Sequence, residues 1–84
     1  MTYSIPDNPD ALLTRDRTAE ALTEAGYPIK AKTLATKATR GGGPPFRKFG
    51  SRALYRWDDA LAWAQSRLTA TLHSTSEQDA RSVS

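Results

Sequence analysis

The run Gly41-Gly42-Gly43-Pro44-Pro45 is the feature that most restricts how this chain can fold. Glycine weakens helices and strands, and proline lacks the N–H group that both need, so neither a helix nor a central strand can cross these five positions. Before the run, apolar residues recur at helical spacing, whereas the segments directly after it are short and typical of strands. Helices must therefore end before the run, and a different local structure must begin after it.

Two helices are predicted upstream of this glycine-proline run. The first spans Arg15–Ala25, with Thr14 as its N-cap and Gly26 at the position where helices commonly stop. After a turn at residues 27–29, a second helix is predicted over Lys30–Thr39, because its apolar residues share one face. These inward residues are Ala31, Leu34, Ala35 and Ala38.

A β-hairpin and a third helix are predicted downstream of the run. Residues Phe46–Phe49 and Ala53–Arg56 have the pattern of two strands, joined by a compact loop over residues 50–52 that contains the glycine a tight hairpin needs. Asp58 is then expected to cap a helix over Asp59–Leu68, whose first turn is acidic, as the helix dipole favours.

This order of elements predicts one small α+β domain over residues 12–72. Helix, turn, recognition helix, β-hairpin wing and C-terminal helix is the order of a winged helix-turn-helix. Residues 1–11 contain two prolines and few apolar side chains, so an irregular lead-in is expected there. Residues 73–84 are polar and serine-rich, and a disordered tail is expected.

Charge divides the chain into a basic middle and acidic flanks. Between Gly26 and Trp57 there are eight basic residues and no acidic residue, so the net charge of +3 combines +8 in this window with −5 elsewhere. Such a block is the pattern expected of a surface that contacts the phosphates of nucleic acid. The alternative is a solvated basic face without a partner. The eight residues are Lys30, Lys32, Lys37, Arg40, Arg47, Lys48, Arg52 and Arg56.

Composition argues against several other classes of protein. The chain of 84 residues is too small for a deep active-site cleft, and it has no cysteine. Its one histidine, His73, lies outside the predicted domain, so we expect no enzyme activity, no metal and no cofactor. There is no apolar run near the roughly 18 residues of a membrane span and no secretion signal at the N-terminus. We therefore expect a cytoplasmic, nucleoid-associated protein without a membrane partner.

Several motifs follow one another in a characteristic order: Lys32-Thr33-Leu34, Arg40 through Phe46, Leu54-Tyr55-Arg56, and Asp58 through Trp63. Over about residues 12–68 they resemble the small excisionase family, the recombination directionality factors with MerR-like DNA-binding domains. The resemblance implies that the second helix enters the major groove of double-stranded DNA and that the wing contacts an adjacent minor groove or the backbone. It also implies side-by-side self-association on repeated sites, and a bent complex that helps a tyrosine recombinase, or integrase, to excise a mobile element.

The outward face of the second predicted helix supplies the candidates for base contact, which are Thr33, Thr36 and Lys37. The alternative is an ordinary solvent-exposed helix face. At the ends of this helix, Lys30, Lys32 and Arg40 are expected to hold phosphates, since most protein–DNA hydrogen bonds go to the backbone. On the wing, Arg52 and Lys48 are favoured over Arg47 and Arg56. Two positions depart from the family: Lys30 replaces a capping Ser or Thr, and Thr36 replaces an Arg of many relatives.

Aromatic residues have two interpretations. They are either platforms on which single-stranded nucleic acid stacks or the large side chains of a small core. The core interpretation is favoured, with Phe49, Tyr55 and Trp63 buried. Strand alternation then places Leu54 on the outside of the wing, where it suggests a contact between protomers.

Two other functions remain open at this stage. The same fold occurs in transcriptional regulators, so the chain is alternatively a regulator of a mobile element. From another class, it is an interaction module whose acidic ends and tail recruit a protein, with DNA binding incidental.

Overall fold

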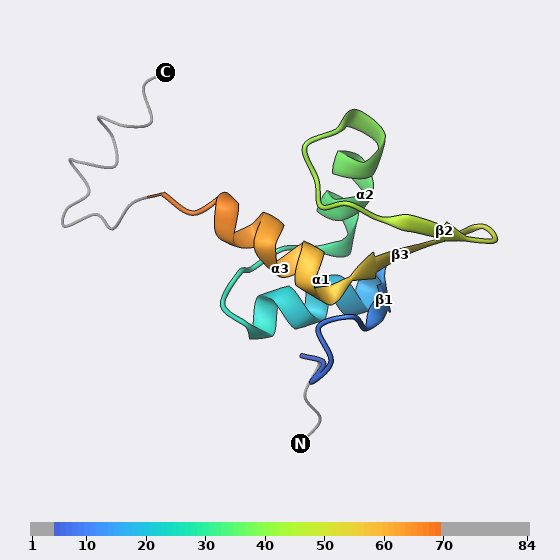
Figure 1. The fold of residues 1–84 in the computed structure, drawn as a ribbon. Coiled ribbons are helices and arrows are strands. Elements are labelled where there is room, and N and C mark those ends of the chain that lie inside the picture. Colours follow the sequence, from blue (N-terminus) through green and yellow to red (C-terminus); the bar gives the residue numbers. More distant parts are fainter. Residues whose placement is uncertain (1–4, 70–84) are drawn as a thin grey trace.

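Strand β3 (Arg52–Arg56) is the centre of the structure, because it pairs with another strand on each side. In the computed structural model, which describes residues 5–69, the chain is an α+β fold with three helices and a three-stranded antiparallel sheet of order β1-β3-β2 (Figure 1). The other elements are β1 (Leu12–Thr14), α1 (Arg15–Glu24), α2 (Ala31–Arg40), β2 (Arg47–Phe49) and α3 (Trp57–Ser66).

Strand β1 is the element that the sequence did not predict. Its three residues are too few to show an alternating pattern, and it passes directly into α1 at Thr14. The strand exists because β3 offers it a free edge, where Leu13 pairs with Tyr55 and Leu12 pairs with Arg56. Order around residue 12 therefore depends on a partner more than forty positions away along the chain.

Helix α1 agrees with the prediction at its first residue. The Thr14 hydroxyl accepts a hydrogen bond from the Arg17 backbone N–H at 3.3 Å, as an N-cap does. The helix ends at Glu24, one residue before the predicted end. Its inward side carries Ala19, Ala21 and Leu22, each at most 6% exposed, which fixes its packing against the sheet and α3.

The core lies between the inner face of the sheet and helices α1 and α3. Tyr55 and Leu22 are fully buried, and Trp57, Ala60 and Ala64 of α3 complete the interior. The Tyr55 hydroxyl accepts a hydrogen bond from Nε of Arg15 at 3.1 Å, which satisfies the polar end of this buried ring. Tyr55 is thus buried as predicted, and Trp63 packs against the core at its edge, half-buried.

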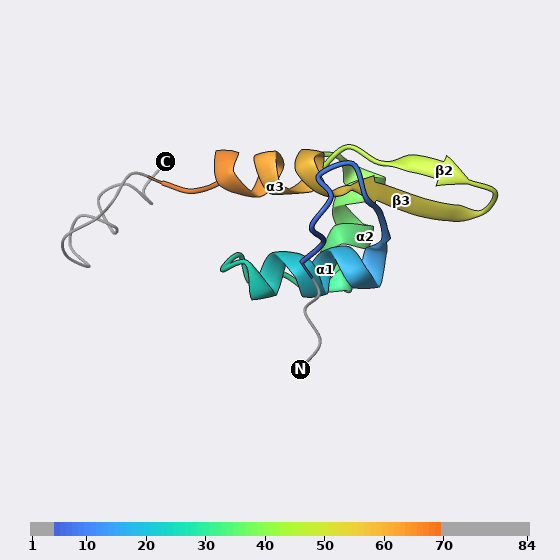
Figure 2. The same ribbon diagram turned by 60° about the horizontal axis from the view of Figure 1, so that its bottom comes forward.

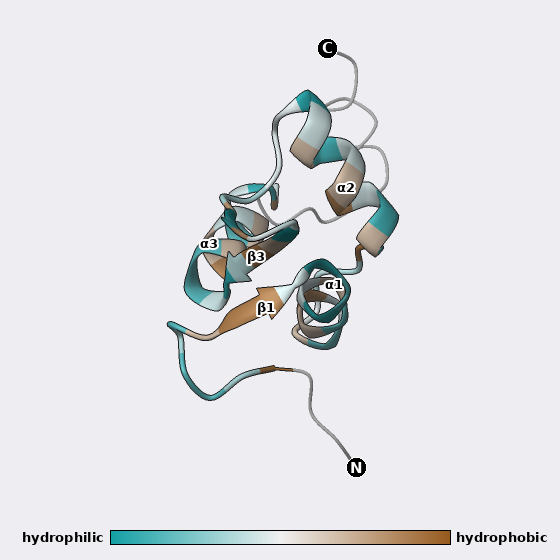
Figure 3. Cartoon of the chain, turned by 90° about the vertical axis from the view of Figure 1, so that its right-hand side faces the viewer, coloured by the Kyte–Doolittle hydropathy of each residue, from teal (hydrophilic) through white to brown (hydrophobic). Residues whose placement is uncertain are grey.

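Helix α2 covers the predicted segment with a shift of one residue at each end. Lys30 is the N-cap and makes no side-chain capping bond, as expected for a lysine at this position. Of the predicted inward stripe only Leu34 is fully buried, whereas the three alanines are half-buried. Hydrophilic residues run along the other side of this helix, and β1 is hydrophobic (Figure 3).

Helix α3 begins earlier than predicted, and the expected capping role of Asp58 is wrong. Strand β3 runs straight into the helix, so Arg56 is the N-cap and Asp58 lies in the first turn. The segment before β1 supplies the missing acceptors, since the Trp57 N–H donates to the Ala11 carbonyl and the Asp58 N–H to the Pro9 carbonyl, each at 2.9 Å. Backbone carbonyls thus replace a side-chain cap. The helix ends at Ser66, which places Arg67 just beyond its last turn.

The loop of the hairpin is one residue shorter than predicted. Strand β2 begins at Arg47, and Arg52 belongs to β3, so the loop consists of Gly50 and Ser51 alone. Gly50 has a φ of +64°, a conformation that glycine adopts without the strain imposed by a Cβ atom. The two strands project beyond the helices at one end of the molecule (Figures 1 and 2).

The burial predicted for Phe49 is wrong. Phe49 is 76% exposed, because it pairs with Arg52 near the end of the hairpin and therefore lies on the face of the sheet opposite Tyr55. Phe46 is closer to the core, with its ring centroid 5.7 Å from that of Tyr55. Leu54 lies on the outer face, in agreement with strand alternation, and is half-buried.

None of the three helices in the described part of the chain is long and apolar enough to span a membrane. The predicted tail over residues 73–84, His73 and the predicted domain end at residue 72 lie outside the described residues.

Candidate nucleic-acid interface

Seven of the eight cations of the basic window lie on α2 and the β2–β3 hairpin. Within residues 5–69 none of them forms an ion pair, and all are exposed except Lys37, which is half-buried. We call this set the basic surface residues. They are Lys30, Lys32, Lys37, Arg40, Arg47, Lys48 and Arg52.

The eighth cation, Arg56, is neutralised by the protein itself. Its Nε donates to Oδ1 of Asp10 at 2.9 Å, and its Nη1 lies 3.1 Å from Asp59 and 3.5 Å from Asp58. The hydrogen bond to Asp10 and the three negative charges raise the pKa of Arg56 above its usual value, against a smaller opposing effect of desolvation. Arg56 therefore already has its anionic partners within the chain.

Acidic residues lie mainly on other elements. Asp16, Glu20 and Glu24 recur every four residues on the exposed side of α1, and Asp58 and Asp59 begin α3. Asp16 lies near the hairpin loop, since it lines a shallow hollow together with Ser51 and Arg52. The charge separation in the sequence is thus also a separation between elements of the fold.

The exposed face of α2 has a definite arrangement. At 3.6 residues per turn, Thr33, Thr36 and Arg40 lie at the centre of this face, with Lys32 on one flank and Lys37 on the other. The Thr36 hydroxyl donates to the Lys32 carbonyl at 3.1 Å, which leaves its methyl group and oxygen lone pairs for an outside contact. Sequence reasoning identified these residues and placed Arg40 on this face at the helix end, but it grouped Lys37 with Thr33 and Thr36, whereas Lys37 lies on the flank.

Lys37 is held in place by the chain that follows α2. A Cβ atom at position 43 would stand 2.9 Å from the Cβ of Lys37, so only glycine fits at position 43 without a shift of Lys37. The stem of Lys37 is therefore packed against the loop.

The hairpin does not present Lys48 and Arg52 to the same side. Residues opposite one another in an antiparallel pair share a face, and Lys48 pairs with Ala53 while Arg52 pairs with Phe49. Lys48 therefore belongs to the face that Tyr55 shares, and Arg52 belongs to the opposite face together with Arg47. The two wing residues favoured from the sequence, Lys48 and Arg52, thus lie on opposite faces, and the cations flank the hairpin on both sides.

The loop over residues 41–46 determines how α2 and the hairpin are placed. Trp63 of α3 donates from Nε1 to the Gly42 carbonyl at 2.9 Å, and Pro44 is buried. This loop is thus fastened to α3, and α2 and the hairpin both lie toward the end of the molecule opposite the C-terminal end of α3 (Figures 1 and 2). The role of the Trp63 N–H was not apparent from sequence, because nothing local marks its partner.

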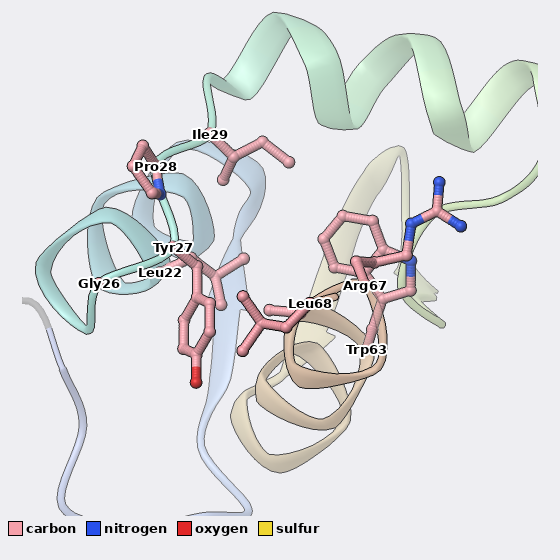
Figure 4. Close-up of a pocket in the computed structure, with 9 residues that line it drawn as sticks. Leu22, Gly26, Tyr27, Pro28, Ile29, Trp63, Arg67 and Leu68 are labelled. Carbon is pink, nitrogen blue, oxygen red and sulfur yellow. The ribbon is translucent and has the colours of Figure 1, made fainter. Parts of the chain in front are cut away.

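A shallow pocket of about 230 Å³ lies elsewhere, between the turn after α1 and the end of α3. Leu22, Tyr27, Ile29, Trp63 and Leu68 converge on it, and Arg67 lies at its rim (Figure 4). Its lining contains no nucleophile paired with a base. Within residues 5–69 there is also no group of three or more His, Cys, Asp or Glu side chains that would hold a metal ion.

Comparison of the chain with known protein families, curated proteins and solved structures finds no significant match. The function of the basic surface must therefore be argued from its geometry and charge.

Proposed function

We propose that this chain is a sequence-specific duplex-DNA-binding protein of the winged helix-turn-helix type, with α2 as recognition helix and the β2–β3 hairpin as wing. The observation that carries the proposal is that, within residues 5–69, the seven basic surface residues form no ion pair and belong to α2 and the hairpin that follows it, while the acids of this part of the chain lie on α1, α3 and the segment before β1. Cations that the fold does not neutralise are available to phosphates, and their attraction to DNA is the main source of affinity in such proteins.

Helix α2 enters the major groove in this proposal. Thr33 and Thr36 present short side chains that allow close approach, and the Thr36 methyl group suits contact with a thymine methyl. Lys37 reaches a base edge or a phosphate from one flank. Lys30, Lys32 and Arg40 hold the two backbones that border the groove.

The biological role that we propose is that of an excisionase, a recombination directionality factor. Support comes from the motifs described above, from Lys32-Thr33-Leu34 to Asp58 through Trp63, which occur in the order of that family. In this role the protein self-associates side by side at an attachment region, bends the DNA and assists a tyrosine recombinase. The alternative is a transcriptional regulator with the same mode of binding.

DNA binding is tested first by salt dependence. Fluorescence anisotropy with a duplex selected by the protein from a random pool should give a plot of log K against log salt with a slope of about −0.9 per phosphate contact. A slope near zero would contradict the proposal, because the basic surface residues would then contribute nothing to affinity.

Recognition of the DNA sequence is tested with the two lysines that flank the exposed face of α2. Lys37→Ala should weaken binding to the selected duplex by about 1–3 kcal/mol and binding to scrambled duplex by less. The matched variant Lys32→Ala, on the opposite flank, should weaken both to the same extent. If Lys37→Ala lowered the affinity for both duplexes equally, Lys37 would be a contact to the DNA backbone and not to a base.

The excisionase role needs a separate assay. Recombination by the element's tyrosine recombinase, with and without this protein, should show excision only in its presence. Specific binding over a promoter without any effect on excision would favour the transcriptional regulator.

A further inference from the structure

Phe49 is the most exposed of the large apolar side chains in the described residues. It ends β2, next to the Gly50-Ser51 loop, and is 76% exposed, compared with 53% for Leu12 and 62% for Leu68. A single exposed apolar residue is common and needs no explanation by itself. The distinctive property of Phe49 is its position at the projecting end of the hairpin.

Cations surround this exposed ring. Arg52 is directly opposite Phe49 across the hairpin, Lys48 precedes it, and Arg47 lies on the same face two residues earlier. No acidic residue occurs in the hairpin, and Asp16, which lines the hollow beside Ser51, forms no ion pair with Arg52 within the described residues. A partner that accepts this apolar ring, with Arg47 and Arg52 on its own face and Lys48 on the other, should be strongly negative around an apolar interior.

Duplex DNA has this combination of properties. Its phosphates form two negative rims, and between stacked base pairs there is an apolar slot that opens when a side chain enters from the minor groove. The backbones of two paired strands are about 4.8 Å apart, and side chains project from both faces of the hairpin. The minor groove is only about 6 Å wide, so the body of the hairpin is too large for it and only the end can enter.

We propose that Phe49 acts as a wedge, which enters the minor groove, inserts partly between two base pairs and kinks the duplex. Arg47 and Arg52, on the same face, hold phosphates beside the opened step, and Lys48 holds a phosphate on the other side of the hairpin. The inference rests on the proposed DNA binding and adds the means by which the bound DNA is bent.

Base unstacking and bending provide the test. The probe is the duplex selected from a random pool, with 2-aminopurine replacing each adenine in turn and a donor and an acceptor dye at its ends. The wild-type protein should raise 2-aminopurine fluorescence at one step and bring the two ends closer together. Phe49→Ala should abolish both signals, lower affinity by no more than about tenfold and leave the salt slope unchanged, because no charge is removed. Phe49→Leu, which keeps an apolar wedge, should retain a partial signal.

Leu12→Ala is the matched control. Leu12 is also exposed and lies on the same face of the sheet, but on β1, at the edge remote from the hairpin loop. This variant should leave fluorescence and bending unchanged. Circular dichroism spectra that match the wild type would show that both alanine variants fold.

Two outcomes would overturn the wedge. If unstacking persists in Phe49→Ala, the ring is not its cause, and if the wild type binds without any unstacking, the proposed insertion does not occur. Loss of self-association in Phe49→Ala, measured by sedimentation without DNA, together with unchanged unstacking, would assign the ring to a contact between protein copies. Failure of the wild type to bind any duplex would instead overturn the proposed function itself, so the two failures are distinguishable.

Discussion

The two ends of strand β3 carry arginines with opposite surroundings. Arg52 and Arg56 are four residues apart on the same face of one strand. Arg52, near the hairpin loop, is exposed and has no ion pair within the described residues, whereas Arg56, at the base, faces the carboxylates of Asp10, Asp58 and Asp59. One arginine is therefore available to an outside anion, and the other already has its anions within the chain.

This difference shows why a count of basic residues along the sequence overestimates how many of them are available to bind an outside anion. The sequence window assigns equal weight to its eight basic residues, but the fold surrounds one of them with Asp10, from a distant segment, and with Asp58 and Asp59, which follow it directly in the sequence. Arg56 thereby joins the N-terminal segment to the start of α3 and serves the fold. The remaining seven residues define the electrostatic footprint on which the proposed function depends.

The largest effect is expected when the hairpin cations are removed together. The triple variant Arg47→Ala, Lys48→Ala, Arg52→Ala should reduce DNA affinity about 100-fold or more near 0.1 M salt and make the slope of log K against log salt shallower by about 2.7. Thermal stability should change little, since the three side chains are exposed and form no ion pair within residues 5–69. Anisotropy titrations and thermal melts measure the two quantities.

Arg17→Ala is the control for this triple variant. Arg17 is an exposed cation of α1 that lies 3.8 Å from Glu20. Its removal should leave the slope unchanged. A loss of affinity in the triple variant at a constant slope would mean that the hairpin cations do not contact phosphates.

The helices were predictable from sequence because their signals are local. Thr14 has a capping side chain, apolar residues recur at helical spacing in α1 and α2, and the glycines and prolines after Arg40 permit no continuation. The two-strand hairpin was predictable for the same reason, with Gly50 at its loop. These features depend on neighbours within a few positions.

The features that sequence reasoning missed depend on partners far along the chain. Strand β1 requires the edge of β3, the start of α3 requires the carbonyls of Pro9 and Ala11, and Trp63 requires the Gly42 carbonyl. Burial of Phe49 is predicted because it is a large apolar residue in a small protein, but the pairing register places it on the face of the sheet opposite Tyr55, where it is exposed. For the candidate site, residue types were predictable from charge, whereas the face that each side chain occupies was not.

A second, smaller effect is expected at the other end of β3. Arg56→Ala should lower the melting temperature by several degrees, because three carboxylates lose their cation and the N-terminal segment loses its attachment to α3. The slope of log K against log salt should remain that of the wild type. Since the pKa of Arg56 is raised in the folded state, its contribution is fully present at neutral pH and is lost only as the pH rises through strongly alkaline values.

Arg52→Ala is the matched variant on the same strand, and its expected behaviour is the reverse. Its melting temperature should be close to that of the wild type, and the slope of log K against log salt should become shallower by about 1. If Arg56→Ala instead changed the slope and left the melting temperature unaltered, the contrast between the two arginines would be wrong.

The smallest effect is expected from Asp10→Asn, which removes one of the three charges around Arg56 and leaves Asp58 and Asp59 in place. The melting temperature should fall by less than in Arg56→Ala. The two changes should also be less than additive in the double variant, because they disrupt the same contact. Asp10 stands between the two residues whose carbonyls accept from the first N–H groups of α3. Hydrogen exchange should therefore become faster at the backbone N–H of Trp57 and Asp58 while that of Leu34, in α2, stays unchanged. Equal acceleration at all three would indicate general destabilisation, and the specific attachment of the N-terminal segment through Arg56 would have to be abandoned.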